Sequence, residues 1–361
     1  MKFASLETNS FRNLENCSLV FENKFTVFSG DNASGKTSIM EALYYMAHAK
    51  SFRASNLRHL VRHGDNGFYL FSSLMGPNGF VPLGLERPIS GKGRIKLDGK
   101  DITSISEVAG LLPLQFMDAD VHRDFASGPI YRRKFLDWGV FHVEHGFRFS
   151  WFNYNKVLKQ RNQALKDRVS FSELRVWDLL LVEHGEQVSH FRQNYLSSFL
   201  EVFYSIWGAL SPGFAAPDIC YNSGIKDEVG FAESLLAARE LDYRLGYTTQ
   251  GPHRCDLILS KDQVSVYNYY SQGQQKALMF VLKVAQGVFL QQTMQKNVIY
   301  LIDDLPSELD SLRISAIIDM LHQHASQVFL TCIKKNDIVD KLPASITGHY
   351  FIDKGNIAAK K

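Results

Sequence analysis

The chain has 361 residues, of which 45% are hydrophobic and 21% are charged, a composition that supplies a large folded core. Lys and Arg number 40 against 37 Asp and Glu, so the net charge of +3 excludes a polybasic or acidic disordered protein but permits a local basic patch. No apolar run approaches the roughly 18 residues of a membrane span, and the N-terminus does not form a signal peptide. The four cysteines are scattered, without a CxxC motif, so we expect a cytoplasmic protein with no membrane partner.

The first third of the chain alternates between strand and helix patterns. Short strands are predicted over residues 2–8, 18–21 and 25–29. The next segment, 37–49, is predicted to be an amphipathic helix because its apolar residues recur with helical spacing. Residues 67–117 return to a β pattern, which includes a hairpin over 94–100 with an Asp-Gly turn.

The middle of the chain differs in character from both ends. Residues from about 130 to 245 contain little Gly or Pro and have helical spacing, which predicts helices packed against each other. Strands and helices then alternate again: strands over 256–259, 298–302 and 327–331, and helices over 274–292 and 311–324. We therefore predict an α/β lobe built from residues 1–130 and 246–361, with an inserted, mostly helical lobe over 131–245.

Residues 30–37, GDNASGKT, fit the phosphate-loop pattern G-x-x-x-x-G-K-[ST] without a gap. Glycines let backbone N–H groups curl around phosphate oxygens, and the helix that follows favours an anion at its N-terminus. Lys36 would reach the β- and γ-phosphates of ATP, and the Thr37 hydroxyl would ligate Mg²⁺. The alternative is a glycine-rich turn with no ligand. The predicted nucleotide-binding residues are Gly30, Asp31, Asn32, Ala33, Ser34, Gly35, Lys36 and Thr37.

An apolar strand pattern over 298–302 ends in Asp303 and Asp304. An acid at the end of a central strand is where a phosphate-loop fold holds Mg²⁺, so Asp303 is the candidate metal residue beside Thr37. Asp304 would lie near the γ-phosphate and polarise the attacking water. Over 260 residues separate Lys36 from Asp303, a separation typical of the SMC-like and ABC-type ATPases.

Three further segments resemble ABC-type motifs. Ser271-Gln272-Gly273-Gln274 resembles the signature turn, in which Ser271 would contact the γ-phosphate held by a second subunit. Residues 307–310 resemble the D-loop that faces the partner, and Gln115 occupies the place of the Q-loop glutamine. Taken alone, Gln115 reads as a surface glutamine.

Over essentially its whole length, the chain resembles the RecF family of bacterial DNA replication and repair proteins. The stretches that carry the resemblance are residues 10–13, 50–53, 131–137, 158–162, 250–256 and 302–310. The resemblance implies an α/β, ABC/SMC-like phosphate-loop ATPase head, built from both chain ends, with a helical lobe and no long coiled coil. It also implies ATP and Mg²⁺ as cofactors and an ATP-dependent homodimer.

The same resemblance implies binding to double-stranded and to gapped or single-stranded DNA, without sequence specificity. It also implies that the protein acts with RecO and RecR to load RecA during recombinational repair, and that it supports the SOS response. Thr331 stands where transporters place a switch histidine. We therefore expect slow, DNA-dependent ATP hydrolysis that acts as a switch.

DNA binding needs cations on one face. Arg148, Lys156, Lys159 and Lys166 fall within a narrow angular range if 148–166 is one helix, and Arg132 and Arg133 are further candidates. A solvated helix face is the alternative for any single lysine. The sequence does not decide whether Arg12 and Arg53 contact the nucleotide or DNA.

Other residues of the middle segment are interpreted as structural. His253 is interpreted as a turn residue, and an aromatic cluster is interpreted as core of the helical lobe: Trp138, Phe141, Phe147, Phe149, Trp151 and Phe152.

Two other functions fit a phosphate loop. The nucleotide-binding subunit of a transporter would have a histidine at position 331 and a shorter chain. A small-molecule kinase would have an adjacent acceptor lid and no Ser-Gln-Gly-Gln segment. A response of ATP turnover to DNA, to membrane vesicles or to small acceptors separates the three.

Overall fold

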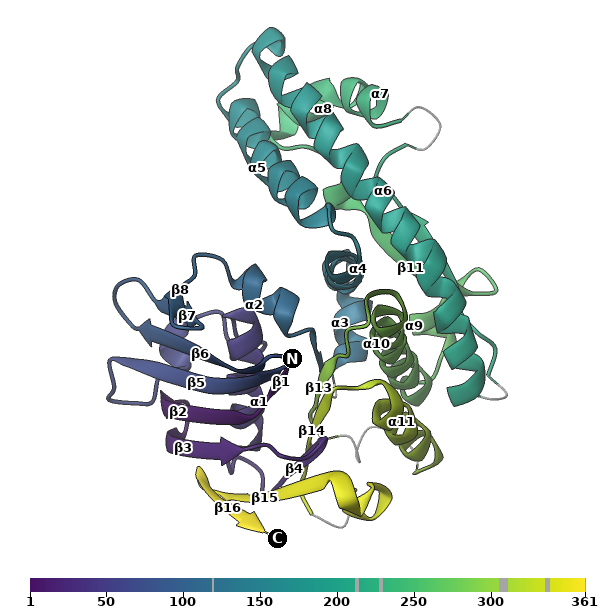
Figure 1. Ribbon diagram of the computed structural model, residues 1–361. Coiled ribbons are helices and arrows are strands. Elements are labelled where there is room, and N and C mark those ends of the chain that lie inside the picture. The colour runs from purple at the N-terminus through teal and green to yellow at the C-terminus, as the bar shows by residue number, and fades with distance from the viewer. Residues whose placement is uncertain (119, 212–213, 227–229, 305–310, 335–337, 361) are drawn as a thin grey trace. The chain divides into compact units, whose positions relative to one another are not determined.

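The structure is a computed structural model that describes residues 1–118, 120–211, 214–226, 230–304, 311–334 and 338–360 (Figure 1). The chain divides into two compact units: Met1–Val121 with Lys276–Lys361, and His122–Gln275. We call these the α/β unit and the helical unit. The limits differ from the predicted 131 and 245, because residues 122–130 and 246–275 group with the inserted helices. Ser271 therefore falls in the helical unit and not in the α/β unit.

The α/β unit contains a mainly parallel sheet of six strands in the order β16-β15-β4-β14-β13-β9. Only β16 runs antiparallel to its neighbour. Every residue of β4, β13 and β14 is buried, as expected for a parallel sheet covered on both faces. The residues that follow these three strands meet at one edge of the sheet. The strands are β4 (Phe25–Ser29), β9 (Leu114–Met117), β13 (Ile299–Ile302), β14 (Gln327–Cys332), β15 (Thr347–Asp353) and β16 (Asn356–Lys360).

A second, antiparallel sheet has the order β3-β2-β5-β6-β7-β8, with β1 paired to β5. Its longer strands alternate buried and exposed residues, so only one face joins the core. The predicted Asp-Gly hairpin turn is confirmed: Asp98 and Gly99 both have positive φ, 52° and 74°. The strands are β1 (Lys2–Phe3), β2 (Ser5–Phe11), β3 (Leu14–Val20), β5 (Gly67–Gly76), β6 (Gly79–Pro88), β7 (Arg94–Leu97) and β8 (Lys100–Asp101).

Helix α1 (Lys36–His48) lies between the two sheets and contacts β2, β5 and β6 of one and β9 and β14 of the other. Its buried residues join one apolar core with both sheets. The other α-helices of the α/β unit are α2 (Ile105–Leu111), α10 (Gln272–Met294), which crosses the boundary between the units, and α11 (Ser311–His324). Its short 3-10 helices are η1 (Leu57–His59), η5 (Val339–Lys341) and η6 (Ala344–Ile346), whereas η2 (Pro252–Arg254) belongs to the helical unit.

The helical unit is organised around α6, a helix of 40 residues that begins with a capping box between Ser170 and Glu173. It also contains a small antiparallel sheet that the sequence did not predict, because β10 is short and pairs with a strand far along the chain. In the described part of the chain, no helix combines the length and apolar character that a membrane span requires. The elements are α3 (Val121–Ser127), α4 (Pro129–Val143), α5 (Phe147–Lys166), α6 (Phe171–Leu210), β10 (Asp218–Asn222), α7 (Gly230–Ala237), α8 (Arg239–Leu245), β11 (Asp256–Lys261), β12 (Val264–Ser265) and α9 (Val266–Tyr269).

A buried ion-pair network joins three helices of this unit. Arg161 of α5 is fully buried and pairs with Asp178 of α6 at 2.8 Å and Asp242 of α8 at 2.7 Å. It also donates to the Thr248 hydroxyl at 2.7 Å. Because each buried charge has an opposite partner, the network holds the helices in one arrangement.

The predicted aromatic core of the helical unit is only partly correct. Phe147 is buried, but Phe149 is 69% exposed, Phe152 is 62% exposed and Trp151 is 41% exposed. The reason is the phase of α5. Tyr154, Val157 and Leu165 occupy its buried face, which leaves Phe149 and Phe152 on the outer face.

His253 is a structural residue, as the sequence analysis interprets it. Its Nε2–H donates to the carbonyl of Thr248 at 3.0 Å, and its Nδ1 accepts from the Tyr154 hydroxyl at 2.6 Å. Burial lowers the pKa of His253 from its usual 6.5 to about 4. The neutral imidazole is therefore the form that the fold holds.

We expect the helical unit to lose stability as pH falls from about 6.5 toward about 4. In that window the unfolded chain binds a proton at His253 that the folded chain does not, whereas above it this contribution is fully present. The drop in melting temperature between about pH 7 and about pH 5 should be smaller in His253→Gln than in the parent protein. His145→Gln, at an exposed position, is the control and should keep the full drop. An equal drop in all three proteins would contradict the assignment.

Candidate nucleotide-binding site

Strand β4 leads directly into the phosphate loop, and α1 begins at Lys36 at its end. Positive φ at Gly30 (152°), Ala33 (61°) and Gly35 (120°) turns the backbone sharply. A Cβ at Gly30 would lie 2.2 Å from the carbonyl oxygen of Ile352, so only glycine fits there. The loop surrounds one side of a cavity of about 520 Å³.

The cavity lies wholly within the α/β unit. Residues 32–37 line it, together with Asp303 and Asp304 after β13 and Thr331 near the end of β14. Gly30 and Asp31 are not among the lining residues, but their carbonyls accept hydrogen bonds from Lys36 Nζ at 2.6 and 2.9 Å. The structure thus brings together the loop and the acidic pair that the sequence separates by more than 260 residues.

Three carboxylates, those of Asp303, Asp304 and Asp31, lie near enough to Lys36 to interact with its charge. Burial lowers its pKa from the usual value, while Asp303 is the strongest of the neighbouring groups that oppose this shift. With its ammonium held by two carbonyls of its own loop, Lys36 lies at the cavity wall beside Thr37.

Asp303 is fixed by two hydroxyl groups. Thr37 Oγ1 donates to one carboxylate oxygen at 3.2 Å, and Thr331 Oγ1 donates to the other at 2.5 Å. The Thr331 oxygen also accepts from the backbone N–H of Asp304 at 2.9 Å. Thr331 therefore contacts the carboxylate of Asp303 and the backbone of Asp304, a role not predicted from the sequence because position 331 was considered only as the place of an absent histidine. The signal is its position near the end of β14, between β4 and β13.

Two nearby arginines have different surroundings. Arg12 makes two 2.7 Å hydrogen bonds to the buried carboxylate of Glu41, and it does not line the cavity. Ser51 also donates to Glu41 and accepts from the backbone N–H of Arg53 at 2.8 Å. Arg53 does line the cavity. Of the two arginines left open by the sequence, only Arg53 reaches this site.

The structure does not bring Gln115 to the cavity, so its predicted place in the catalytic site is corrected. Its side chain is buried and donates to Gln286 of α10 at 2.9 Å. Successive side chains of a strand point to opposite faces, and the β9 register places Gln115 away from the phosphate loop.

Ser271 immediately precedes α10 and is exposed. Its backbone N–H donates to Gln274 Oε1 at 2.8 Å, while the N–H of Gln274 lies 3.4 Å from Ser271 Oγ, the arrangement of a capping box. The segment 307–310, interpreted as a D-loop, lies outside the described residues.

Two of the six candidate DNA-binding cations, Arg132 and Arg133, have partners within the helical unit. Arg132 makes hydrogen bonds of 2.7 and 2.9 Å to the carboxylate of Asp256 and is only 12% exposed. Arg133 donates to the carbonyl of Cys255 at 2.7 Å. Both residues connect α4 to the segment around β11, and the paired, largely buried Arg132 is therefore assigned a structural role, whereas a DNA contact of Arg133 stays a prediction. Lys156 and Lys159 are exposed on α5.

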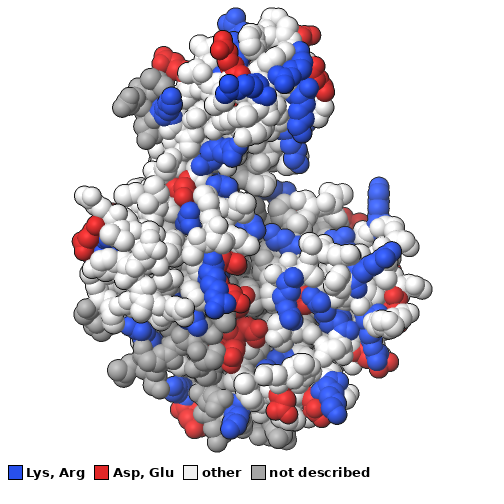
Figure 2. Space-filling model, turned by 180° about the vertical axis from the view of Figure 1, so that it is seen from behind, with Lys and Arg blue, Asp and Glu red and all other residues white. Residues whose placement is uncertain are grey.

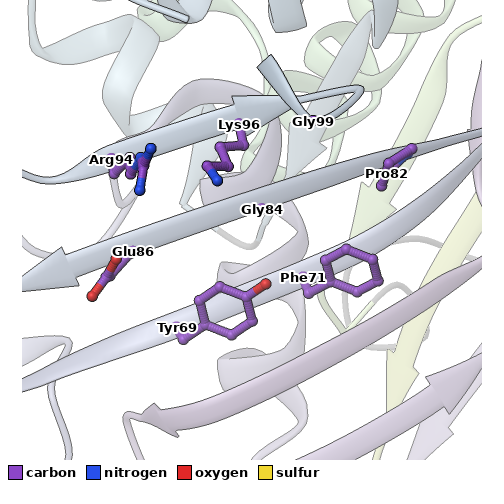
Figure 3. A pocket seen from close by; sticks show the side chains of 8 residues that line it. All are labelled: Tyr69, Phe71, Pro82, Gly84, Glu86, Arg94, Lys96 and Gly99. Carbon is purple, nitrogen blue, oxygen red and sulfur yellow. The ribbon is translucent and has the colours of Figure 1, made fainter. Parts of the chain in front are cut away.

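A second hollow, of about 320 Å³, lies on the outer face of the antiparallel sheet (Figure 3). Tyr69 lies over Gly84, its hydroxyl 3.3 Å from the place of a Cβ there. Arg94 is paired with Asp101 at 2.5 Å, and Glu86 lies across from it in the ladder. This hollow is not formed by a glycine-rich loop at the start of a helix, which distinguishes it from the phosphate-loop cavity.

A phosphate loop after β4, an Asp pair after β13 and an intervening β14 define the class: this is the head of an ABC/SMC-type ATPase. The family model described as RecF/RecN/SMC N terminal domain matches residues 2–356. The chain is 36% identical to the DNA replication and repair protein RecF of Pseudoalteromonas translucida, over 94% of this chain and 93% of the relative. It is 35% identical to the RecF of Cronobacter sakazakii, over 99% of both chains. The chain belongs to the RecF family of DNA replication and repair proteins.

Solved structures agree on the fold. A structure of the recombination mediator protein RecF-ATP in the RecFOR pathway superposes with a TM-score of 0.88 at 24% identity, covering 100% of this chain and 98% of that one. The Smc head domain of Pyrococcus furiosus gives a TM-score of 0.61 at 14% identity, covering 100% and 96%. The ABC/SMC-like fold predicted from the sequence is confirmed.

Proposed function

We propose that this protein is an ATP-driven switch that binds DNA during recombinational repair. The observation that carries the proposal is the convergence of Lys36, Thr37 and Asp303 on one cavity, in a chain of the RecF family. ATP binding, dimerisation and DNA binding are the three steps of the switch.

The residues at the cavity fit ATP and Mg²⁺. Ser34 Oγ is buried in the loop and has no hydrogen-bond partner among the described residues, so it is available to an anion. Backbone N–H groups of residues 32–37 and the Lys36 ammonium would hold the phosphates. Thr37 and Asp303 would hold Mg²⁺, which supplies charge neutralisation to the phosphate oxygens. Arg53 adds a second cation at the cavity wall.

Asp304 is the residue we assign to water activation. Its backbone N–H donates to Thr331, and Asp304 is one of the residues that line the cavity. A carboxylate there accepts a hydrogen bond from the attacking water and orients it. Thr331 gives no imidazole at this position, so we propose slow hydrolysis, suited to a switch that stays closed for long periods.

The exposed N-terminus of α10 is the surface we assign to the partner subunit. The first N–H groups of a helix attract anions, and Ser271 adds a hydroxyl beside them. In the closed homodimer, each Ser271 would meet the nucleotide held by the other subunit. ATP thereby becomes part of the dimer interface.

The DNA surface we propose is α5, whose exposed lysines Lys156 and Lys159 would contact phosphates. No base-reading motif accompanies them, so binding is independent of sequence. By family membership we extend the proposal to double-stranded and gapped DNA, to partnership with RecR and RecO, and to RecA loading and the SOS response.

The test is a salt titration of DNA binding with a non-hydrolysable ATP analogue, followed by fluorescence anisotropy. Each phosphate contact on duplex DNA contributes about 0.9 to the slope of log affinity against log salt. We expect Lys156→Ala with Lys159→Ala to lower that slope by up to about two, equally for different DNA sequences.

The matched control is Lys92→Ala with Lys100→Ala, which removes the same charge from exposed positions of the α/β unit. It should keep the parent slope. An unchanged slope in the α5 variant would move the DNA surface elsewhere. ATP turnover that responds to membrane vesicles or small acceptors, but not to DNA, would favour a transporter subunit or a kinase.

A further inference from the structure

Two large aromatic side chains of α5 are left in solvent. Phe149 is 69% exposed and Phe152 is 62% exposed, more than any other phenylalanine described in the helical unit. An edge-to-face contact with His184 of α6, at 6.2 Å between ring centroids, holds one side of Phe149. Stability alone does not explain two exposed rings one helical turn apart.

The cations of α5 share the helical face of these rings. At 100° per residue, positions 148, 149, 152, 156, 159 and 166 fall within about a third of the helix circumference. Arg148, Lys156, Lys159 and Lys166 are all exposed. We call these six residues the α5 face.

The α5 face is positive, and its own helix supplies no acidic side chain. None of the 20 residues of α5 is Asp or Glu. In Figure 2, Lys and Arg side chains gather along one edge of the helical unit. A partner must therefore carry negative charge together with flat or apolar groups.

We propose that the α5 face binds unpaired nucleotides, with Phe149 and Phe152 stacking on bases while Lys156 and Lys159 contact the neighbouring phosphates. Aromatic rings among cations are the recurrent means of binding single-stranded nucleic acid without sequence preference, because every base has a stacking face. Duplex DNA offers the same phosphates, but its bases are already stacked and leave the two rings unused. The inference rests on the proposed DNA-binding function and extends it to the kind of strand that α5 recognises.

The test compares a labelled oligo-dT with a blunt duplex, by anisotropy over a salt series, in the presence of the ATP analogue. The key variant is Phe149→Leu with Phe152→Leu, which keeps the apolar surface and removes the stacking faces. We expect its affinity for oligo-dT to fall at least about fivefold per stacked base. The salt slope should stay constant, because no phosphate contact is removed. Duplex affinity and ATP binding should not change.

Two further proteins complete the design. Phe149→Trp with Phe152→Trp restores stacking and should restore oligo-dT affinity. Phe80→Leu removes a phenylalanine of matching exposure, 64%, from the α/β unit and should have no effect.

Each outcome decides one claim. Oligo-dT affinity that is unchanged in the leucine variant, or lost equally for duplex, overturns the inference and leaves the DNA-binding proposal standing. Failure of the parent protein to bind either DNA overturns the proposed function itself.

Discussion

Replacing Lys36 by Met should lower ATP turnover at least about a hundredfold, the usual loss when a positioned donor to developing charge is removed. Lys36 is the loop's own cation, and two loop carbonyls already hold its ammonium at the cavity wall. Met has a similar length without the charge, so the backbone of the loop should persist while the phosphates lose their main side-chain partner. Equilibrium binding of a fluorescent ATP analogue and steady-state phosphate release measure the two effects.

Lys36→Arg and Lys92→Met sharpen this test. The arginine keeps the charge but places it differently, so ATP binding should survive while hydrolysis is lost. Lys92→Met removes an exposed lysine of the same unit and should match the parent protein in both assays. Parent-level turnover in Lys36→Met would refute the assignment of the cavity to ATP.

The phosphate loop was predictable because its residues are contiguous and each has a local task. The strand, the glycines and the helix start are all visible in residues 25–49. Asp303 was predictable for a related reason: an apolar strand that ends in an acid brings the acid to the sheet edge. Their meeting at 3.2 Å between Thr37 and Asp303 follows once both strands join one parallel sheet.

The incorrect assignments concern orientation and distant partners. Gln115 lies in a strand of four residues, where a shift of one residue decides which face a side chain takes. Arg132 is paired with an acid 124 residues away, and nothing in the local sequence distinguishes it from a free surface cation. Thr331 was visible as a departure from the transporter pattern, but its bonds to Asp303 and Asp304 require the sheet order.

In the helical unit, too, the sequence predicted the helix but not the direction of its side chains. Periodicity identified α5 correctly but did not fix which of its aromatic residues face inward. That choice is set by α6 and by the buried Arg161 network, whose acids come from other helices. The exposed position of Phe149 and Phe152, and the inference built on it, therefore follow only from the folded unit.

Ser271→Arg should abolish ATP-dependent dimerisation while leaving ATP binding by the single subunit unchanged. Ser271 lies at the exposed start of α10, outside the unit that holds the cavity. An arginine there adds bulk at the surface assigned to the partner's nucleotide and removes the hydroxyl of the capping box. Light scattering with and without the ATP analogue should show a doubling of mass for the parent protein and a constant mass for the variant.

Loss of the cap by itself destabilises a helix by about 1 kcal/mol, so the variant needs a control that separates interface from folding. Ser271→Asn provides it, because asparagine is an equally good N-cap and stays small. If the interface assignment is correct, Ser271→Asn keeps more of the ATP-dependent dimer than Ser271→Arg at a temperature where both variants are folded and bind ATP equally. A parent protein whose mass does not change with ATP would refute the dimer switch. Full dimerisation of Ser271→Arg would instead place the γ-phosphate contact on another surface of the partner.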